Sequence, residues 1–194
     1  MVEVHQQEVM ASLRKLMVKM YRRNPREFKK AGLAYTEAQI ESYVAALFDT
    51  EHDWRFAELD YRKNIDSIHL AFNPRYQGDR VFALFVGLGS MIMTSYNDKR
   101  EFFVLDDLDA QKLYNSARNV EIAIWKLNHI RDEQGALLLL SNEDGGLVRN
   151  FSFERLAGKV IALQDAMSKV VATKSKRIIK DAIQFIASKV FLPI

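Results

Sequence analysis

The sequence predicts an all-α fold: a single-domain bundle, residues 1–194, of about seven helices around a buried apolar helix over residues 81–96. The central segment contains no charged residue, and a helix that is apolar on every side is buried by other helices or immersed in lipid. It is shorter than the roughly 20 residues of a bilayer span, so no transmembrane span is expected. Most other segments repeat apolar residues at the helical period, with only three prolines and eight glycines in the chain.

The first predicted helix covers residues 3–22, and a short second helix follows it. Asn24, Pro25 and Glu27 form a capping-box pattern with proline at the first helical position, and Gly32 is expected to end this second helix. The apolar stripe of the first helix consists of Val9, Leu13, Leu16, Met17 and Met20.

Two further helices are predicted before the central one. Thr36 and Gln39 form a capping box ahead of the third helix. Its apolar face consists of Ile40, Tyr43, Val44, Leu47 and Phe48. A fourth helix is predicted from Trp54 to Phe72. It is expected to end there because Asn73, the residue before Pro74, avoids the α region.

The central helix is predicted to begin after Asp79, which can cap it. It contains the small residues Ala83, Gly87, Gly89 and Ser90. Gly87 and Gly89 do not continue as a dinucleotide fingerprint, because residue 92 is isoleucine. Since each glycine costs about 1 kcal/mol of helix propensity, we expect these small residues to let neighbouring helices approach closely.

The longest helix is predicted over residues 108–134, with aspartates at its N-terminus, where the helix dipole favours them. Its buried stripe consists of Leu113, Ala117, Val120, Ile124 and Leu127. Residues 135–141 fit a short strand or an apolar loop, and residues 143–146 fit a flexible turn.

Two further helices are predicted at the end of the chain, over residues 152–173 and 175–191. The last is apolar and basic, as interfacial helices also are, but we expect it to pack on the body.

Charge is distributed unevenly along the chain. The net charge is +3, but residues 1–30 and 150–194 each carry +5 and residues 31–149 carry −7. Basic ends can bind an anionic partner or dock on the acidic middle, and the pattern favours docking. No cysteine is present, which excludes disulfides, thiolate nucleophiles and cysteine-based metal sites.

The sequence contains no motif for catalysis, a metal or a cofactor. None of the four histidines fits the Glu-x-x-His or His-Glu-x-x-His pattern, and no serine lies in a Gly-x-Ser-x-Gly elbow. Glu51, His52 and Asp53 are adjacent, but neighbouring residues on a helix point in different directions. We therefore expect a non-enzymatic protein without a catalytic, cofactor or metal site.

The densest basic patch predicts an anion-binding or partner-binding site. Arg22, Arg23 and Arg26 flank the helix start at Asn24 and Pro25, where backbone N–H groups and cations together suit a phosphate or a carboxylate. No recognisable nucleic-acid module surrounds the patch. A protein or an anionic envelope component is therefore the expected partner.

Several stretches resemble uncharacterised proteobacterial envelope proteins with lipoprotein-type leaders. These stretches are residues 19–27 (KMYRRNPRE), 78–84 (GDRVFAL), 114–127 (YNSARNVEIAIWKL) and 140–142 (LSN). The resemblance covers most of the chain and carries no activity with it. It implies export to the periplasm and lipid anchoring through a cysteine preceding Met1, where this sequence begins.

The resulting functional hypothesis is a non-enzymatic binding or scaffolding protein of the periplasm or cell envelope, with the cytoplasm as the alternative location. A second hypothesis is a carrier of an apolar, lipid-like ligand. Its cavity would lie among Phe82, Phe85, Met91, Met93 and Trp125, although such side chains at helical spacing more often form plain core. A third is a nucleic-acid-binding accessory protein, based on the basic ends alone.

Overall fold

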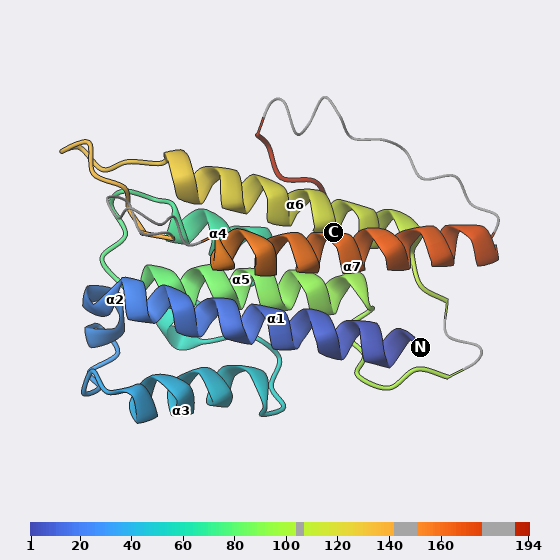
Figure 1. Cartoon of the computed structure of the whole chain (residues 1–194), viewed down its shortest axis with the longest axis horizontal. Helices are drawn as coiled ribbons and strands as arrows, with labels where there is room; N and C mark the ends of the chain where they lie inside the picture. The colour runs from blue at the N-terminus through green and yellow to red at the C-terminus, as the bar shows by residue number, and fades with distance from the viewer. Residues whose placement is uncertain (104–106, 142–150, 176–188) are drawn as a thin grey trace.

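The computed structural model describes residues 1–103, 107–141, 151–175 and 189–194. These ranges form an all-α bundle with one 3₁₀ turn, and their only β pairing is an isolated bridge between Arg131 and Leu137 (Figure 1). In chain order the elements are α1 (Val2–Arg23), α2 (Pro25–Lys29), α3 (Glu37–Phe48), η1 (Ala57–Leu59), α4 (Asn64–Ala71), α5 (Arg80–Ser95), α6 (Ala110–His129) and α7 (Ser152–Ser175). The predicted fold class is confirmed.

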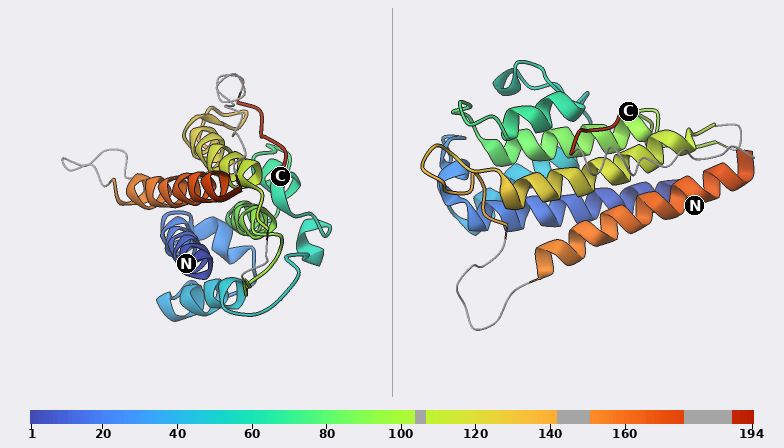
Figure 2. Two further views of the ribbon diagram at one scale, coloured as in Figure 1. Left: turned by 90° about the vertical axis from the view of Figure 1, so that its right-hand side faces the viewer. Right: turned by 90° about the horizontal axis from the view of Figure 1, so that it is seen from above.

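Helix α5 is the centre of the bundle, as its uncharged sequence predicted. Every one of its residues except Thr94 is buried. Helices α1, α4 and α6 pack against it, and α3 packs against α1. Helix α7 lies obliquely across α1 and α6 (Figure 2). Asp79 caps α5 by accepting a hydrogen bond from the backbone N–H of Phe82 at 2.9 Å, so the predicted cap is confirmed.

The predicted capping box at α2 is wrong, because tertiary contacts use both of its polar side chains. The Asn24 side chain donates to the backbone oxygen of Leu140 at 2.8 Å and accepts from its N–H at 2.9 Å. Glu27 accepts from the N–H of Arg80 at 2.7 Å. These residues therefore join α2 to the loop after α6 and to the start of α5. The cap of α3 by Thr36 is confirmed.

The predicted helix from Trp54 to Phe72 is wrong in its first half, where the chain forms a loop and the short η1. Trp54, Asp60 and Tyr61 have φ values of 63°, 51° and 57°, which interrupt a right-handed helix. The Trp54 ring lies so close to α5 that a Cβ on Gly89 would be 2.3 Å from it. Burial of this indole, which is 3 % exposed, favours the loop over the local helical pattern.

The small residues of α5 bring α4 into close contact, as predicted. A Cβ on Gly87 would lie 2.8 Å from the backbone oxygen of Asn64 and 2.8 Å from the backbone nitrogen of Ile68. The Ser90 hydroxyl accepts from the N–H of Asn64 at 2.6 Å. Gly87 therefore sits against the α4 backbone itself.

Helix α6 ends at His129 rather than near residue 134, and α7 with 24 residues is longer than α6 with 20. The chain becomes extended at Ile130, whose ψ is 127°. Ile124 of the predicted stripe is only partly buried, whereas the other four residues are buried. Residues 135–141 form a loop that buries Leu139, and the predicted turn at 143–146 lies outside the described residues.

Most of the predicted helix 175–191 lies outside the described residues, and residues 189–191 are not helical. The segment that ends the chain docks on α6. Asn119 donates to the backbone oxygen of Leu192 at 2.8 Å and accepts from its N–H at 2.6 Å. Phe191 and Leu192 are buried, so the chain end is part of the folded body.

A buried polar network fixes α7 on the bundle. The Gln164 side chain accepts from the Tyr96 hydroxyl at 2.8 Å and donates to Ser95 and Ser116 at 3.1 and 2.6 Å. All four residues are essentially inaccessible to water. Because buried polar groups need partners, this network specifies how α7 sits against α5 and α6.

Candidate functional site

Helix α1 lies between α3 and α7 (Figure 1). Its outer face forms the floor of a groove that is also lined by residues of these two helices. We call it the basic groove. It has a volume of about 350 Å³. Its lining consists of Ala11, Arg14, Lys15, Val18, Lys19 and Arg22 from α1, Glu41 from α3, and Leu156 from α7. Four cations therefore face a single carboxylate in this lining.

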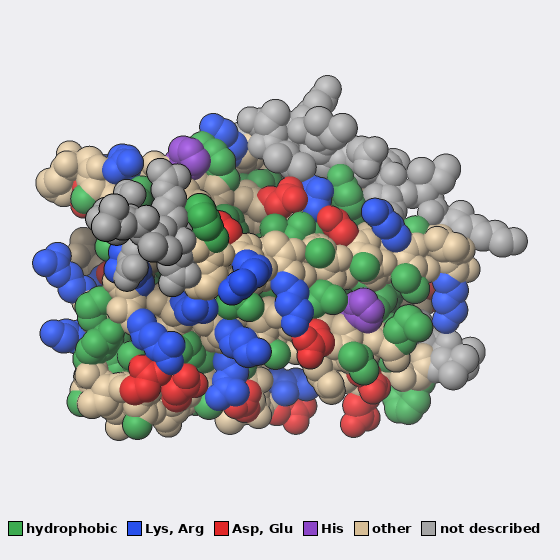
Figure 3. All heavy atoms as spheres, in the orientation of Figure 1, with side chains coloured by type: hydrophobic (Ala, Val, Ile, Leu, Met, Phe, Trp, Pro, Cys, Tyr) green, Lys and Arg blue, Asp and Glu red, His purple; other side chains and the backbone are tan. Residues whose placement is uncertain are grey.

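The sequence of α1 explains this arrangement. Its apolar stripe faces the core, and residues on one helical face recur every three or four positions. Lys15, Lys19 and Arg22 follow that spacing on the opposite face. Figure 3 shows Lys and Arg side chains gathered over the middle of this side of the molecule, with acidic side chains along its lower edge over α3.

The cations of the basic groove differ in their partners. Arg22 pairs with Glu37 and, at 3.6 Å, with Glu41. The hydrogen bond to Glu37 raises the pKa of Arg22. Lys19 donates to the Ser152 hydroxyl at 2.9 Å, and the side chain of Lys15 is exposed. Arg14 pairs with Asp49 and Glu41 at 3.6 and 3.9 Å. The groove thus combines two arginines paired with carboxylates and two lysines, of which Lys15 is exposed and Lys19 is half-buried.

The structure separates the three arginines of the predicted anion site. Arg22 lines the basic groove, but Arg23 and Arg26 are not part of its lining. Arg26 is exposed on α2 and Arg23 is half-buried at the end of α1. Sequence reasoning missed the groove cations Arg14, Lys15 and Lys19. The signal that could have found them was their helical spacing with Arg22.

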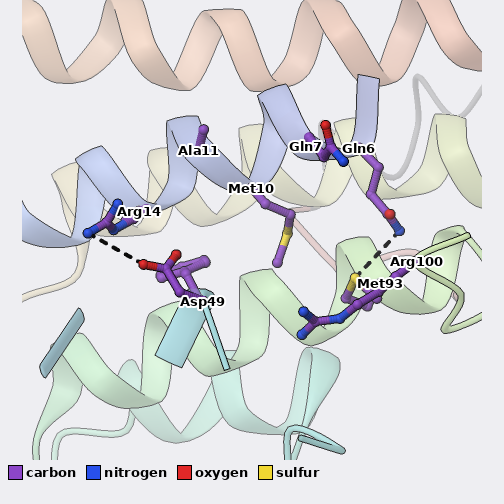
Figure 4. A pocket seen from close by; sticks show the side chains of 9 residues that line it. Gln6, Gln7, Met10, Ala11, Arg14, Asp49, Met93 and Arg100 are labelled. Atoms are coloured by element: carbon purple, nitrogen blue, oxygen red, sulfur yellow. Dashed lines mark hydrogen bonds and ion pairs between the residues drawn. The ribbon is translucent and has the colours of Figure 1, made fainter. Parts of the chain in front are cut away.

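A second pocket continues the basic groove toward the start of α1 and shares Ala11 and Arg14 with it. We call it the Arg14–Arg100 pocket (Figure 4). It has a volume of about 290 Å³. The rest of its lining is Gln6, Gln7, Met10, Phe48, Asp49, Met93 and Arg100. From Gln6 to Arg22 the two hollows follow α1 for about 24 Å, at about 1.5 Å per residue.

The apolar cavity expected in the core has no counterpart in these two hollows. Of the five side chains expected to form it, only Met93 lines either hollow. Phe82, Phe85 and Met91 are buried in the hydrophobic core, and Phe82 packs on Tyr43 and Phe56. Trp125 stacks on His129, with ring centroids 4.2 Å apart.

Among the described residues, no group of three or more His, Asp or Glu side chains is placed to hold a metal ion. The His52 ring is held by the backbone: its Nε2 lies 2.7 Å from the oxygen of Leu47, and its Nδ1 accepts from the N–H of Trp54 at 3.0 Å. The ring therefore anchors the loop that begins at the end of α3.

One buried carboxyl group with a shifted pKa lies outside both hollows. Asp79 accepts a hydrogen bond from the Tyr21 hydroxyl at 2.6 Å, which links α1 to the start of α5. Burial raises the pKa of Asp79 to about 7, although the hydrogen bonds from Tyr21 and from the N–H of Phe82 act in the opposite direction. This group can therefore change its charge near neutral pH.

None of the described helices is both long and apolar enough to cross a membrane. Comparison of the chain with protein-family models, with curated proteins and with solved structures found no match.

Proposed function

We propose that this is a non-enzymatic binding protein whose basic groove receives an acidic amphipathic helix of a protein partner. The observation that carries the proposal is the set of four cations around the groove floor, between two helical walls, in a lining that contains one carboxylate, that of Glu41. Docking of an amphipathic helix into a groove between helices is a recurring mode of recognition.

The shape of the groove suits a helix. Apolar contacts are available from Ala11 and Leu156, while Lys15 and Lys19 supply charge. From Ala11 to Arg22 the floor extends about 16 Å, which matches about three turns of a partner helix. Leucines on such a helix would contact the floor, and its glutamates would lie beside the lysines.

The distribution of acidic residues favours a protein partner over a uniform polyanion. The α3 wall carries Glu37, Glu41 and Asp49 beside the cations of α1. Nucleic acid or an anionic bilayer presents negative charge on all sides, and like charges placed together across an interface are unfavourable. Val18, on the floor, is only 6 % exposed, so a flat lipid surface has little apolar area to bury there.

Charge reversal in the basic groove tests the proposal. The probe is a fluorescein-labelled synthetic helix of about 14 residues, sufficient to span the floor, with glutamates on one face and leucines on the other. We expect Lys15→Glu/Lys19→Glu to weaken its binding by about tenfold or more, measured by fluorescence anisotropy, because attraction becomes repulsion. Exposed charges contribute about 0–1 kcal/mol each to stability, so thermal melting should change little.

Arg23→Glu/Arg26→Glu is the matched control, because it makes the same change in charge outside the groove lining. We expect it to leave peptide binding nearly unchanged. Equal losses in both pairs would indicate general charge attraction, and a larger loss in the control would favour the patch that the sequence predicted. Preferential binding of phosphatidylglycerol vesicles or single-stranded DNA over the peptide would contradict the choice of partner.

From the sequence resemblance we also propose that the protein works on the periplasmic side of the cell envelope. The measurement is protease digestion of the native protein in intact spheroplasts. We expect degradation with the inner membrane still closed, and protection until lysis would point to the cytoplasm instead.

A further inference from the structure

We propose that the Arg14–Arg100 pocket is a binding site for a small organic monocarboxylate with an apolar body. The proposal goes beyond the partner groove and does not depend on it, because Met10, Met93 and Arg100 line this pocket and are not part of the lining of the basic groove.

Arg14 has unused hydrogen-bonding capacity. Its Nε is buried without an acceptor. Its guanidinium lies 3.6 Å from the Asp49 carboxylate and 3.9 Å from that of Glu41, and both distances exceed that of a normal hydrogen bond. The ion pairs therefore hold the guanidinium in place without saturating its donors. An incoming carboxylate could accept hydrogen bonds from it.

Arg100 is held at the opposite side of the pocket by contacts of its own loop. Gln6 donates to the backbone oxygen of Lys99 at 2.7 Å, and the N–H of Phe102 donates to Glu3 at 3.0 Å. Arg100 itself donates to the backbone oxygen of Thr50 at 3.0 Å. Figure 4 shows its side chain extending across the pocket toward the side where Arg14 and Asp49 lie. A second guanidinium is thus positioned before any ligand binds.

The charges of the lining select a monoanion. Asp49 and Glu41 both pair with Arg14, whereas the guanidinium of Arg100 donates to the backbone oxygen of Thr50. The positive charge offered to a ligand is therefore that of Arg100. A guanidinium binds a carboxylate through two parallel hydrogen bonds, so one carboxylate would neutralise this charge. A dianionic phosphate would leave a negative charge beside Asp49.

The remaining walls suit an apolar body. Met10, Phe48 and Met93 line the pocket together with the arginines, and methionine side chains adapt to ligands of varied shape. The volume of about 290 Å³ corresponds to about ten water molecules at about 30 Å³ each. It therefore accommodates an acid of about this number of non-hydrogen atoms.

Methionine methyl NMR provides a direct test. The methyl groups of Met10 and Met93 line the pocket, whereas Met17, Met20 and Met91 are buried in the core and serve as internal references. Titration with hexanoate into the low tens of millimolar should shift the Met10 and Met93 signals saturably and leave the references unmoved. Hexanamide, the neutral analogue, should bind at least tenfold more weakly, and hexyl phosphate more weakly than hexanoate.

Variants complete the test. Arg100→Gln should weaken hexanoate binding at least tenfold, whereas Arg75→Gln, an equal change of charge at an exposed residue outside the pocket lining, should have no effect. The proposal is overturned if hexanoate produces no shift, if hexanamide binds equally well, or if hexyl phosphate binds more tightly. Binding that Lys15→Glu/Lys19→Glu abolishes but Arg100→Gln does not would place the anion in the basic groove and also overturn it.

Discussion

Replacing Gly87 with alanine is expected to lower the free energy of unfolding by about 2–3 kcal/mol, the upper range for overpacking of a well-packed core. The added Cβ would lie 2.8 Å from two backbone atoms of α4, the oxygen of Asn64 and the nitrogen of Ile68. Backbone atoms in a packed helix cannot move aside as the end of a flexible side chain can. Helices α4 and α5 would therefore have to separate, which also disturbs the hydrogen bond from the Asn64 N–H to Ser90.

Gly158 in α7 provides the matched control, because a Cβ there would meet no atom within 4 Å. Gly158→Ala should raise stability by about 0.5–1 kcal/mol, since alanine is the better helix former. Urea denaturation of the two variants beside the parent protein measures both effects. If both substitutions were stabilising, α4 would not approach α5 as closely as the structure shows.

Elements whose signals are local could be predicted from the sequence. The cap of α3 at Thr36, the cap of α5 at Asp79 and the uncharged run of α5 each depend on residues close together in the chain. The segment around Trp54 could not be predicted in the same way. Its conformation depends on an indole packed beside Gly89, thirty-five residues away, and helical periodicity contains no information about that contact.

In the candidate site, too, local signals could be predicted and contacts between distant elements could not. Arg22 was found because it lies in a dense basic run of the sequence. The groove, in contrast, exists only because α3 and α7 dock on either side of α1. The spacing of Lys15 and Lys19 is visible in the sequence, whereas the walls beside them are not. Asn24 illustrates the converse: its sequence matches a cap, yet its side chain binds Leu140, more than a hundred residues away.

The stability of the protein should fall as the pH rises from about 4 to about 7, through the ionisation of Asp79. Burial raises its pKa from 3.8 to about 7, so the folded state binds this proton more tightly than the unfolded state does. The stabilisation is fully present below the unfolded pKa and is lost as the pH rises through the folded pKa. At about 1.4 kcal/mol per pKa unit, the loss amounts to about 4 kcal/mol.

Asp79→Asn isolates this contribution, because the amide resembles the protonated carboxyl. Its oxygen can still accept from the N–H of Phe82, and its NH₂ group can donate to the Tyr21 hydroxyl. We therefore expect the variant to match the parent protein near pH 4 and to exceed it in stability at pH 8, measured by urea denaturation across that range. Subtracting the two curves cancels the contributions of groups that titrate in both proteins, including His69, whose pKa is lowered by burial.

Tyr21→Phe in the parent protein gives a second readout. Removing the hydroxyl that donates to the carboxylate should raise the pKa of Asp79 further. The free energy of unfolding should then fall by a larger amount between pH 4 and pH 8 than it does in the parent protein. Parallel curves for the parent protein and Asp79→Asn would show that Asp79 ionises in the folded state as it does in the unfolded chain.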